Sequence, residues 1–199
     1  MTTHSTSPAP RLAQVVTEVT APAPTALALL LVVAWHSSPS RWAAVAWGTV
    51  AVVFASLLPL AFILRGVRTG RWSDRHVSQH TQRRLPLAVG IASVTAGLVL
   101  LAAGGAPRQL LALVAAMLTG LASTLLVSLY WKLSIHTAVV AGAATILCLV
   151  FGLALLVLAP AVALVAWSRV ALKDHTWPQT AAGAALGVLA AAAVFPALT

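Results

Sequence analysis

The sequence predicts an all-α integral membrane protein, a compact bundle of six or seven transmembrane helices with a polar site at one membrane face. Of its 199 residues, 60% are hydrophobic and only 8% are charged. A soluble domain of this length carries about a quarter charged residues to solvate its surface. The chain also contains a series of apolar runs close to the roughly 20 residues that cross a bilayer core. Both observations indicate that lipid is the solvent for most of the chain.

Seven apolar runs are candidate spans, of which the first and the sixth are short. They cover residues 21–35, 43–64, 87–103, 110–130, 138–158, 161–170 and 180–198. Helix breakers separate three pairs of runs, at Ser38-Pro39-Ser40, at Gly104-Gly105 with Pro107, and at Ala159-Pro160. Small residues, as in 181–185, allow close packing of the helices. We expect one transmembrane domain over residues 21–199.

Residues 1–20 are expected to form a disordered or interfacial segment before that domain. Residues 1–10 are polar and rich in Ser, Thr and Pro, a composition typical of disorder. Leu12, Val15, Val16 and Val19 then recur at helical spacing. This pattern predicts a short helix over residues 11–20 that lies on the membrane surface.

The connections between the spans alternate in character. Three are short and nearly neutral (36–41, 104–108 and 159–160), whereas 65–86, 131–136 and 168–179 are polar. With seven spans, the polar connections share one face with the N-terminus. That face then holds ten of the twelve basic residues, all three acids and five of the six histidines. The segregation predicts a functional site there, and the positive-inside rule assigns that face to the cytoplasm.

Charge and composition exclude several classes of function. A net charge of +9 would suggest nucleic acid in a soluble protein, but beside apolar spans it indicates membrane topology and anionic headgroups. The three acids are Glu18, Asp74 and Asp174. They are too few for paired-carboxylate hydrolysis, for a di-metal centre or for an aspartate-rich Mg²⁺ motif. His76 and His80 could bind a metal from one helix face, but no third ligand is evident, so we expect no metal and no cofactor.

Three clusters on the polar face carry the candidate chemistry. They are Asp74-Arg75-His76 with Gln82-Arg83-Arg84-Leu85-Pro86, then Lys132-Leu133-Ser134-Ile135-His136, then Ser168-Arg169 followed by His175 and Gln179. Each cluster alone has a plainer explanation. Arginines beside a span usually set topology, and a histidine at a helix end is more often an interfacial polar residue than a catalyst.

Taken together, the order and spacing of the clusters resemble the type 2 phosphatidic acid phosphatase superfamily, which includes lipid phosphate phosphatases. Its third motif is matched by Ser168-Arg169-(Val-Ala-Leu-Lys-Asp)-His175-(Thr-Trp-Pro)-Gln179, with glutamine in place of the family's aspartate. The second is matched by Ser134-Ile135-His136, without its proline and glycine. The first survives as Arg83-Arg84-Leu85-Pro86, with no lysine at the expected distance. The resemblance covers residues 65–187.

The resemblance implies a role for each matched residue, and the chemistry of the residues supports it. His175 is the expected nucleophile, and His136 is the acid that protonates the departing oxygen and later activates water. Gln179 can orient His175 but supplies no negative charge, for which Asp174 and Asp74 are candidate sources. The expected phosphate-binding residues are Arg83, Arg84, Lys132, Ser134, Ser168 and Arg169.

We therefore expect a phosphatase of the cell membrane that works without metal through a phosphohistidine. Its substrate would be a lipid phosphate or diphosphate, such as an isoprenyl diphosphate or phosphatidate. Two alternatives remain, a phosphotransferase on the same scaffold and a non-enzymatic membrane protein that keeps the fold. No nucleic-acid partner is expected, and the oligomeric state stays open.

Overall fold

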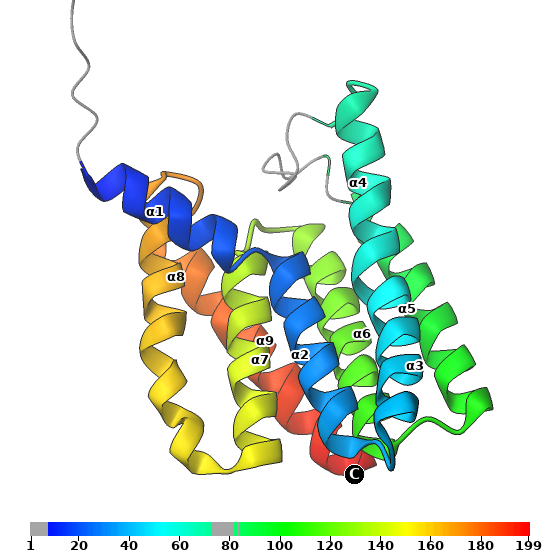
Figure 1. The fold of residues 1–199 in the computed structure, drawn as a ribbon. Helices are drawn as coiled ribbons and strands as arrows, with labels where there is room; N and C mark the ends of the chain where they lie inside the picture. Colours follow the sequence, from blue (N-terminus) through cyan, green and yellow to red (C-terminus); the bar gives the residue numbers. More distant parts are fainter. Residues whose placement is uncertain (1–7, 73–81, 83) are drawn as a thin grey trace, which may run out of the picture.

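A computed structural model describes residues 8–72, 82 and 84–199, which are helical apart from their connections and contain no strand (Figure 1). The α-helices are α1 Pro8–Val19, α2 Pro22–Ser37, α3 Arg41–Val52, α4 Leu58–Arg68, α5 Arg84–Gly104, α6 Arg108–Ser128, α7 Ile135–Phe151, α8 Ala159–Ala171 and α9 Trp177–Leu198. A π-helical turn, η1 (Val53–Leu57), joins α3 to α4, and a 3-10 helix, η3 (Leu153–Leu158), precedes α8. The predicted all-α fold is confirmed.

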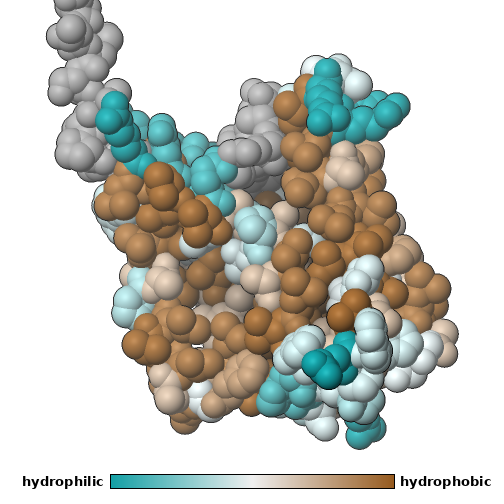
Figure 2. Space-filling model, viewed as in Figure 1, coloured by the Kyte–Doolittle hydropathy of each residue, from teal (hydrophilic) through white to brown (hydrophobic). Residues whose placement is uncertain are grey.

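The helices form a multi-pass membrane bundle. Within the described residues five helical segments are long and apolar enough to cross a membrane: Arg41–Arg68, Arg84–Gly104, Arg108–Ser128, Leu153–Ala171 and Trp177–Leu198. The pair α1–α2, bent by 41°, is a sixth candidate, and α7 is a shorter apolar helix of 17 residues. Figure 2 shows an apolar band across the face in view, with polar residues gathered toward its two ends.

The described ends of the three polar connections lie on one side of the bundle. Figure 1 shows α1, the end of α4, the α6–α7 connection and the α8–α9 connection at the same end of the molecule. The α2–α3 and α5–α6 turns, the link between α7 and α8, and the C-terminus lie at the other end. The alternation expected from seven passes is therefore present in the fold.

One predicted boundary is wrong. The run 138–158 was expected to form one span and 161–170 the next, with a break at Ala159-Pro160. In the structure α7 ends at Phe151, and Leu153–Ala171 forms one continuous segment. The chain turns at Gly152, whose φ of 101° suits only glycine. Pro160 sits in the first turn of α8, where a missing backbone N–H costs no helical hydrogen bond.

Helices α7 and α9 pack backbone against backbone. A Cβ added at Gly183 would lie 2.3 Å from the carbonyl oxygen of Ser134, and one added at Gly187 would lie 2.0 Å from that of Ala138. The backbone N–H of Ser134 donates to the carbonyl of Gln179 over 3.1 Å. Small residues therefore permit an approach that no larger side chain would allow. This contact fixes the polar end of α7 against the polar end of α9.

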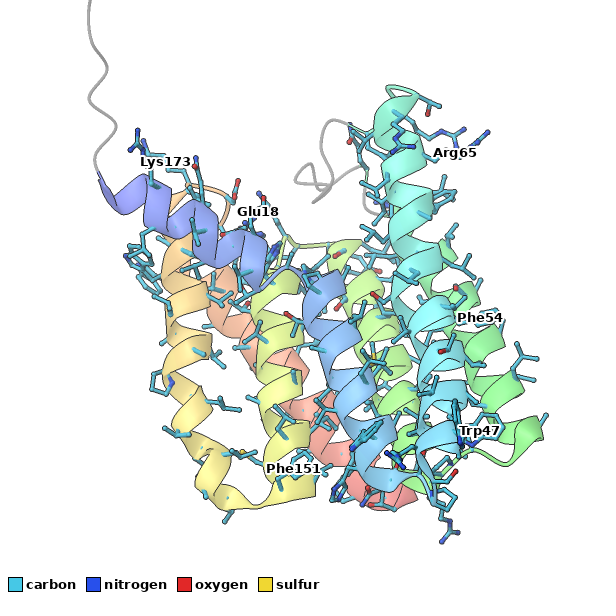
Figure 3. The ribbon with its side chains drawn as sticks, viewed as in Figure 1. Glu18, Trp47, Phe54, Arg65, Phe151 and Lys173 are labelled. Atoms are coloured by element: carbon cyan, nitrogen blue, oxygen red, sulfur yellow. The ribbon has the colours of Figure 1, made fainter. Side chains whose placement is uncertain are left out.

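Glycines of α5 also allow a close approach to α3 and η1, but they contact side chains there instead of backbone. Gly97 faces Phe54, and Gly104 faces the ring of Trp47, two residues labelled in Figure 3. The hydroxyl of Ser93 also donates to the carbonyl of Phe54 over 2.6 Å. That bond takes up a carbonyl at the π-helical turn, where the regular helical hydrogen-bond pattern is interrupted.

Helix α1 lies across the polar end of α8 (Figure 1). It begins at Pro8, three residues before the predicted start, and it is amphipathic. Ala13 and Thr17 are buried, whereas Leu12 and Val15 are more than half exposed. Figure 2 shows a polar upper side and an apolar lower side along this helix. The expected interfacial helix therefore also covers part of the bundle.

Candidate active site

A cavity of about 420 Å³ opens toward the polar end of the bundle, and three of the predicted site residues line it. They are His136 from α7, Arg169 from α8 and His175 from the α8–α9 connection. Their exposed fractions are only 4%, 2% and 6%. The fold thus brings two imidazoles and a guanidinium from separate segments to one buried space.

A hydrogen bond to Gln179 orients the ring of His175. Nδ1 of His175 lies 3.2 Å from Oε1 of Gln179, and the same oxygen accepts from the backbone N–H of Thr176 over 3.1 Å. A backbone N–H can only donate, so the group it meets must be the amide oxygen rather than the amide nitrogen. The oxygen can only accept, so Nδ1 of His175 carries a proton. In the neutral ring, Nε2 is then the nitrogen without a proton.

His136 is the second residue of α7, next to the positive end of the helix dipole. Ser134 is the N-cap of that helix, and its hydroxyl oxygen accepts from the backbone N–H of Thr137 over 3.4 Å. The hydroxyl of Thr137 donates to the carbonyl of Thr180 on α9 over 2.9 Å. Ser134 is fully buried and is absent from the cavity lining, so its observed role is to cap α7.

Arg169 is held from two sides. Its Nη2 forms an ion pair with Oδ2 of Asp174 over 2.8 Å. Its Nη1 donates to the hydroxyl of Thr17 on α1 over 3.4 Å. Asp174, a candidate source of negative charge for His175, thus pairs with the arginine; the other candidate, Asp74, lies outside the described residues. A guanidinium has five donors in a plane, so these two contacts fix the directions in which its N–H groups point.

Lys132 reaches the site from the outer side. Its Nζ donates to the backbone carbonyl of Asp174 over 2.6 Å. It lines a shallow surface depression together with Lys173, His175 and Gln179. His175 borders both this depression and the deep cavity. The imidazole therefore stands between a basic surface and a buried space.

Two further predicted phosphate ligands, Ser168 and Arg84, do not line the cavity. The hydroxyl of Ser168 donates to the carbonyl of Val165 over 2.8 Å and lies 3.2 Å from that of Thr17, so it joins α8 to α1 beside the cavity. Arg84 is exposed at the first position of α5, two residues before the cavity-lining Pro86. Arg83 lies outside the described residues.

Comparison of the chain with family models, curated proteins and solved structures finds no match. The site is therefore interpreted from its own geometry.

The described residues contain no group of three or more His, Cys, Asp or Glu side chains that could hold a metal ion. The alternative pair His76 and His80 lies outside the described residues, as does Asp74. The ionisable groups that border the cavity are instead two imidazoles, one guanidinium and one acid, Glu18, and the hydroxyls of Ser56 and Thr124 also line it. Such a set suits a phosphate anion better than a hard cation, which prefers several oxygen ligands.

Two residues of α1 belong to the site and were missed in the sequence. Thr17 contacts both Ser168 and Arg169, and Glu18 lines the cavity at the C-terminal end of α1 (Figure 3). Glu18 carried a signal, because it is one of only three acids in the chain. The sequence also contained a signal for the start of α9. Thr followed three residues later by Gln, as in Thr176-Trp177-Pro178-Gln179, is the pattern of a capping box.

Proposed function

We propose that this protein is a lipid phosphate or diphosphate phosphatase that acts through a phosphohistidine. The observation that carries the proposal is the buried cavity lined by His136, Arg169 and His175. Two imidazoles and a guanidinium are the groups that phosphoryl transfer requires in the absence of a metal: a nucleophile, an acid and a counter-charge. The match of motif order to the phosphatidic acid phosphatase superfamily points to the same chemistry.

In the first half-reaction, Nε2 of His175 attacks phosphorus with its lone pair. In a lipid monophosphate, the bond from phosphorus to the lipid oxygen breaks, and its electron pair stays on that oxygen; in a diphosphate attacked at its terminal phosphorus, the bridging oxygen takes this place and a lipid monophosphate leaves instead of the alcohol. His136, starting as an imidazolium, gives the oxygen a proton, so a neutral lipid alcohol leaves. The hydrogen bond from Nδ1 of His175 to Gln179 keeps Nε2 available for the attack.

In the second half-reaction, the neutral His136 takes a proton from water while the water oxygen attacks the phosphohistidine. The nitrogen–phosphorus bond breaks, and its electron pair returns to Nε2 of His175. Inorganic phosphate leaves, and both imidazoles regain their starting states. Arg169 stabilises the negative charge on the phosphoryl oxygens in both steps, because its guanidinium is already fixed by Asp174 and Thr17.

The proposal places the site at the cytoplasmic face of the cell membrane, since most basic residues flank the polar connections. Impermeant thiol labelling tests this orientation at Arg71→Cys and Arg108→Cys, each in a Cys148→Ser background that removes the native thiol. We expect labelling from outside intact cells at position 108 and protection at position 71. External labelling at position 71 would overturn the orientation without touching the chemistry.

Phosphate release by the detergent-purified protein tests the activity. The panel contains isoprenyl diphosphates, phosphatidate and simple alkyl phosphates, with and without EDTA. We expect turnover that EDTA leaves unchanged, and a loss of about 100-fold or more in His175→Ala, His136→Ala and Arg169→Ala. The matched controls are His36→Ala and Arg108→Ala, which change exposed residues at the opposite end of the bundle.

Each outcome separates the candidate functions. Release of phosphate that depends on the three residues supports the phosphatase. A stoichiometric phosphorylated acceptor in place of free phosphate would favour a transferase on the same scaffold. A folded protein that releases nothing from any member of the panel would contradict the proposal and favour a non-enzymatic role.

A further inference from the structure

The candidate site is only one end of a much deeper space. From the polar end the cavity continues between the helices to an apolar end lined by Leu113 and Met117 of α6, Ile146 of α7, and Ala190 and Ala191 of α9. One turn farther along α6 and α9, Leu110 and Phe195 belong to the buried core. The space therefore begins at the two histidines and ends against the packed interior.

The depth of the cavity corresponds to about one leaflet. His136 and Ile146 are ten residues apart on α7, which is about 15 Å at a rise of 1.5 Å per residue. The hydrocarbon core of a bilayer is about 30 Å thick, so one leaflet takes up half of that. A chain inside the cavity could therefore extend from the headgroup level to the bilayer midplane between the helices.

The lower walls suit hydrocarbon and not water. Below the polar end the lining is aliphatic, and a polar group on the wall of α2 and η1 is already satisfied, because the hydroxyl of Ser56 donates to the carbonyl of Ala23 over 3.0 Å. Ordered water needs two to four polar partners, and apolar cavities of this kind stay dry until an apolar ligand enters. The volume of about 420 Å³ falls in the range of a single small-ligand pocket.

We infer that this cavity holds the hydrocarbon tail of the substrate, and that it admits one chain of about a dozen carbon atoms. The inference rests on the proposed phosphatase function. An extended backbone advances about 3.5 Å over three bonds, so 15 Å spans about a dozen bonds. The phosphate of such a lipid meets His136, Arg169 and His175, and the end of its chain reaches Ala191. The substrate class is accordingly a single-chain lipid phosphate or diphosphate, and a diacyl lipid would have to place its second chain outside this cavity.

Two substitutions should shift the preferred tail length in opposite directions. Ala191→Leu fills the apolar end, and we expect it to lower kcat/KM for dodecyl phosphate about tenfold, as overpacking does in a core, and to leave hexyl phosphate unchanged. Met117→Ala enlarges the same end and should raise kcat/KM for octadecyl phosphate relative to that for dodecyl phosphate. The matched control is Ala192→Leu, because Ala192 is the exposed neighbour of Ala191 and should leave all three rates unchanged.

Hexyl phosphate distinguishes failure of the phosphatase proposal from failure of the tail cavity, since its chain is too short to reach Ala191. If the wild type releases no phosphate from hexyl, dodecyl or octadecyl phosphate, the phosphatase proposal fails. If hexyl phosphate is hydrolysed but neither variant changes the ratio of rates between tail lengths, only the tail cavity is wrong. Equal kcat/KM for phosphatidate and dodecyl phosphate in the wild type would likewise overturn the single-chain assignment. Opposite shifts in Ala191→Leu and Met117→Ala cannot come from general misfolding.

Discussion

The site residues are held by two kinds of contact, and the difference shows which parts of the site are rigid. On one side, α7 and α9 meet backbone to backbone through Gly183 and Gly187, with hydrogen bonds between their main chains and through Thr137. On the other side, α8 is held at its polar end by α1, through side-chain hydroxyls of Thr17 and Ser168. The segment leading into α8 is largely exposed.

The two contacts should differ in how well they tolerate substitutions. The contact of α7 with α9 sets where His136 lies relative to the helix that follows His175, and it leaves no room for adjustment. The position of Arg169 depends in part on a hydroxyl, that of Thr17 on the surface helix α1. We therefore expect substitutions between α7 and α9 to abolish folding or activity, and substitutions between α1 and α8 to weaken phosphate binding by graded amounts.

The largest effect is expected from Gly187→Ala. The new Cβ would lie 2.0 Å from the carbonyl oxygen of Ala138, and because that oxygen belongs to a helix backbone, the two helices must separate. We expect a loss of about 3 kcal/mol in the free energy of unfolding, measured by denaturant titration in micelles. Gly120→Ala is the control, since its Cβ would meet the Cβ of Ala190 at an ordinary 3.9 Å. Equal stability of the two variants would contradict the tight contact.

A smaller effect is expected from Asp174→Asn, which removes the ion-pair partner of the buried Arg169. Asp174 is about a third exposed, so solvent screens part of the interaction. We expect a loss of about 1 kcal/mol in the free energy of unfolding and a several-fold rise in KM for phosphate substrates. Because the carboxylate of Asp174 pairs with Arg169, the pH profile of kcat should stay the same. A shift of that profile would show that this carboxylate acts on the histidine after all.

Thr17→Val tests the attachment of α1 with a single hydroxyl. It removes the contacts to Ser168 and Arg169 while it keeps the size and branching of the side chain. Loss of one such hydrogen bond typically costs about 1 kcal/mol, and we expect a several-fold rise in KM with little change in kcat. Thr20→Val is the matched control, because the hydroxyl of Thr20 bonds only within α1, to the carbonyl of Val16. Identical kinetics for both variants would show that α1 does not position the arginine.

The smallest effect is expected at Gln179. Gln179→Glu keeps the length of the side chain and the acceptor for Nδ1 of His175 and adds a negative charge, which favours the positively charged phosphorylated ring. We expect kcat to rise about threefold, and we expect Gln179→Met, which has similar length but no acceptor, to lower it. Gln179→Asp should raise kcat less, because the shorter side chain leaves a longer gap between its carboxylate and Nδ1 of His175. Unchanged rates in all three variants would mean that other groups orient the ring.

The sequence predicts much of this fold because hydropathy alone specifies where a chain can cross lipid. The boundary at Gly152 escaped prediction because Gly152 and Ala159-Pro160 are both local breakers, and only packing decides which of them turns the chain. The contact of His175 with Gln179 follows from their spacing of four residues. The parts missed, Thr17 and Glu18, depend on α1 folding over α8, a contact between segments about 150 residues apart that no local pattern encodes. The capping role of Ser134 escaped prediction because a capping serine and a ligand serine look alike in sequence.

Direct detection of a phosphohistidine is the measurement closest to the central claim. Wild-type protein is mixed with ³²P-labelled dodecyl phosphate, quenched in alkali after a few milliseconds and analysed for protein-bound label that is stable in base and lost in acid. We predict such label on the wild type, mapped to the peptide that contains His175, and none on His175→Ala. Turnover in the wild type without trapped label, or equal label on His175→Ala, would contradict the account.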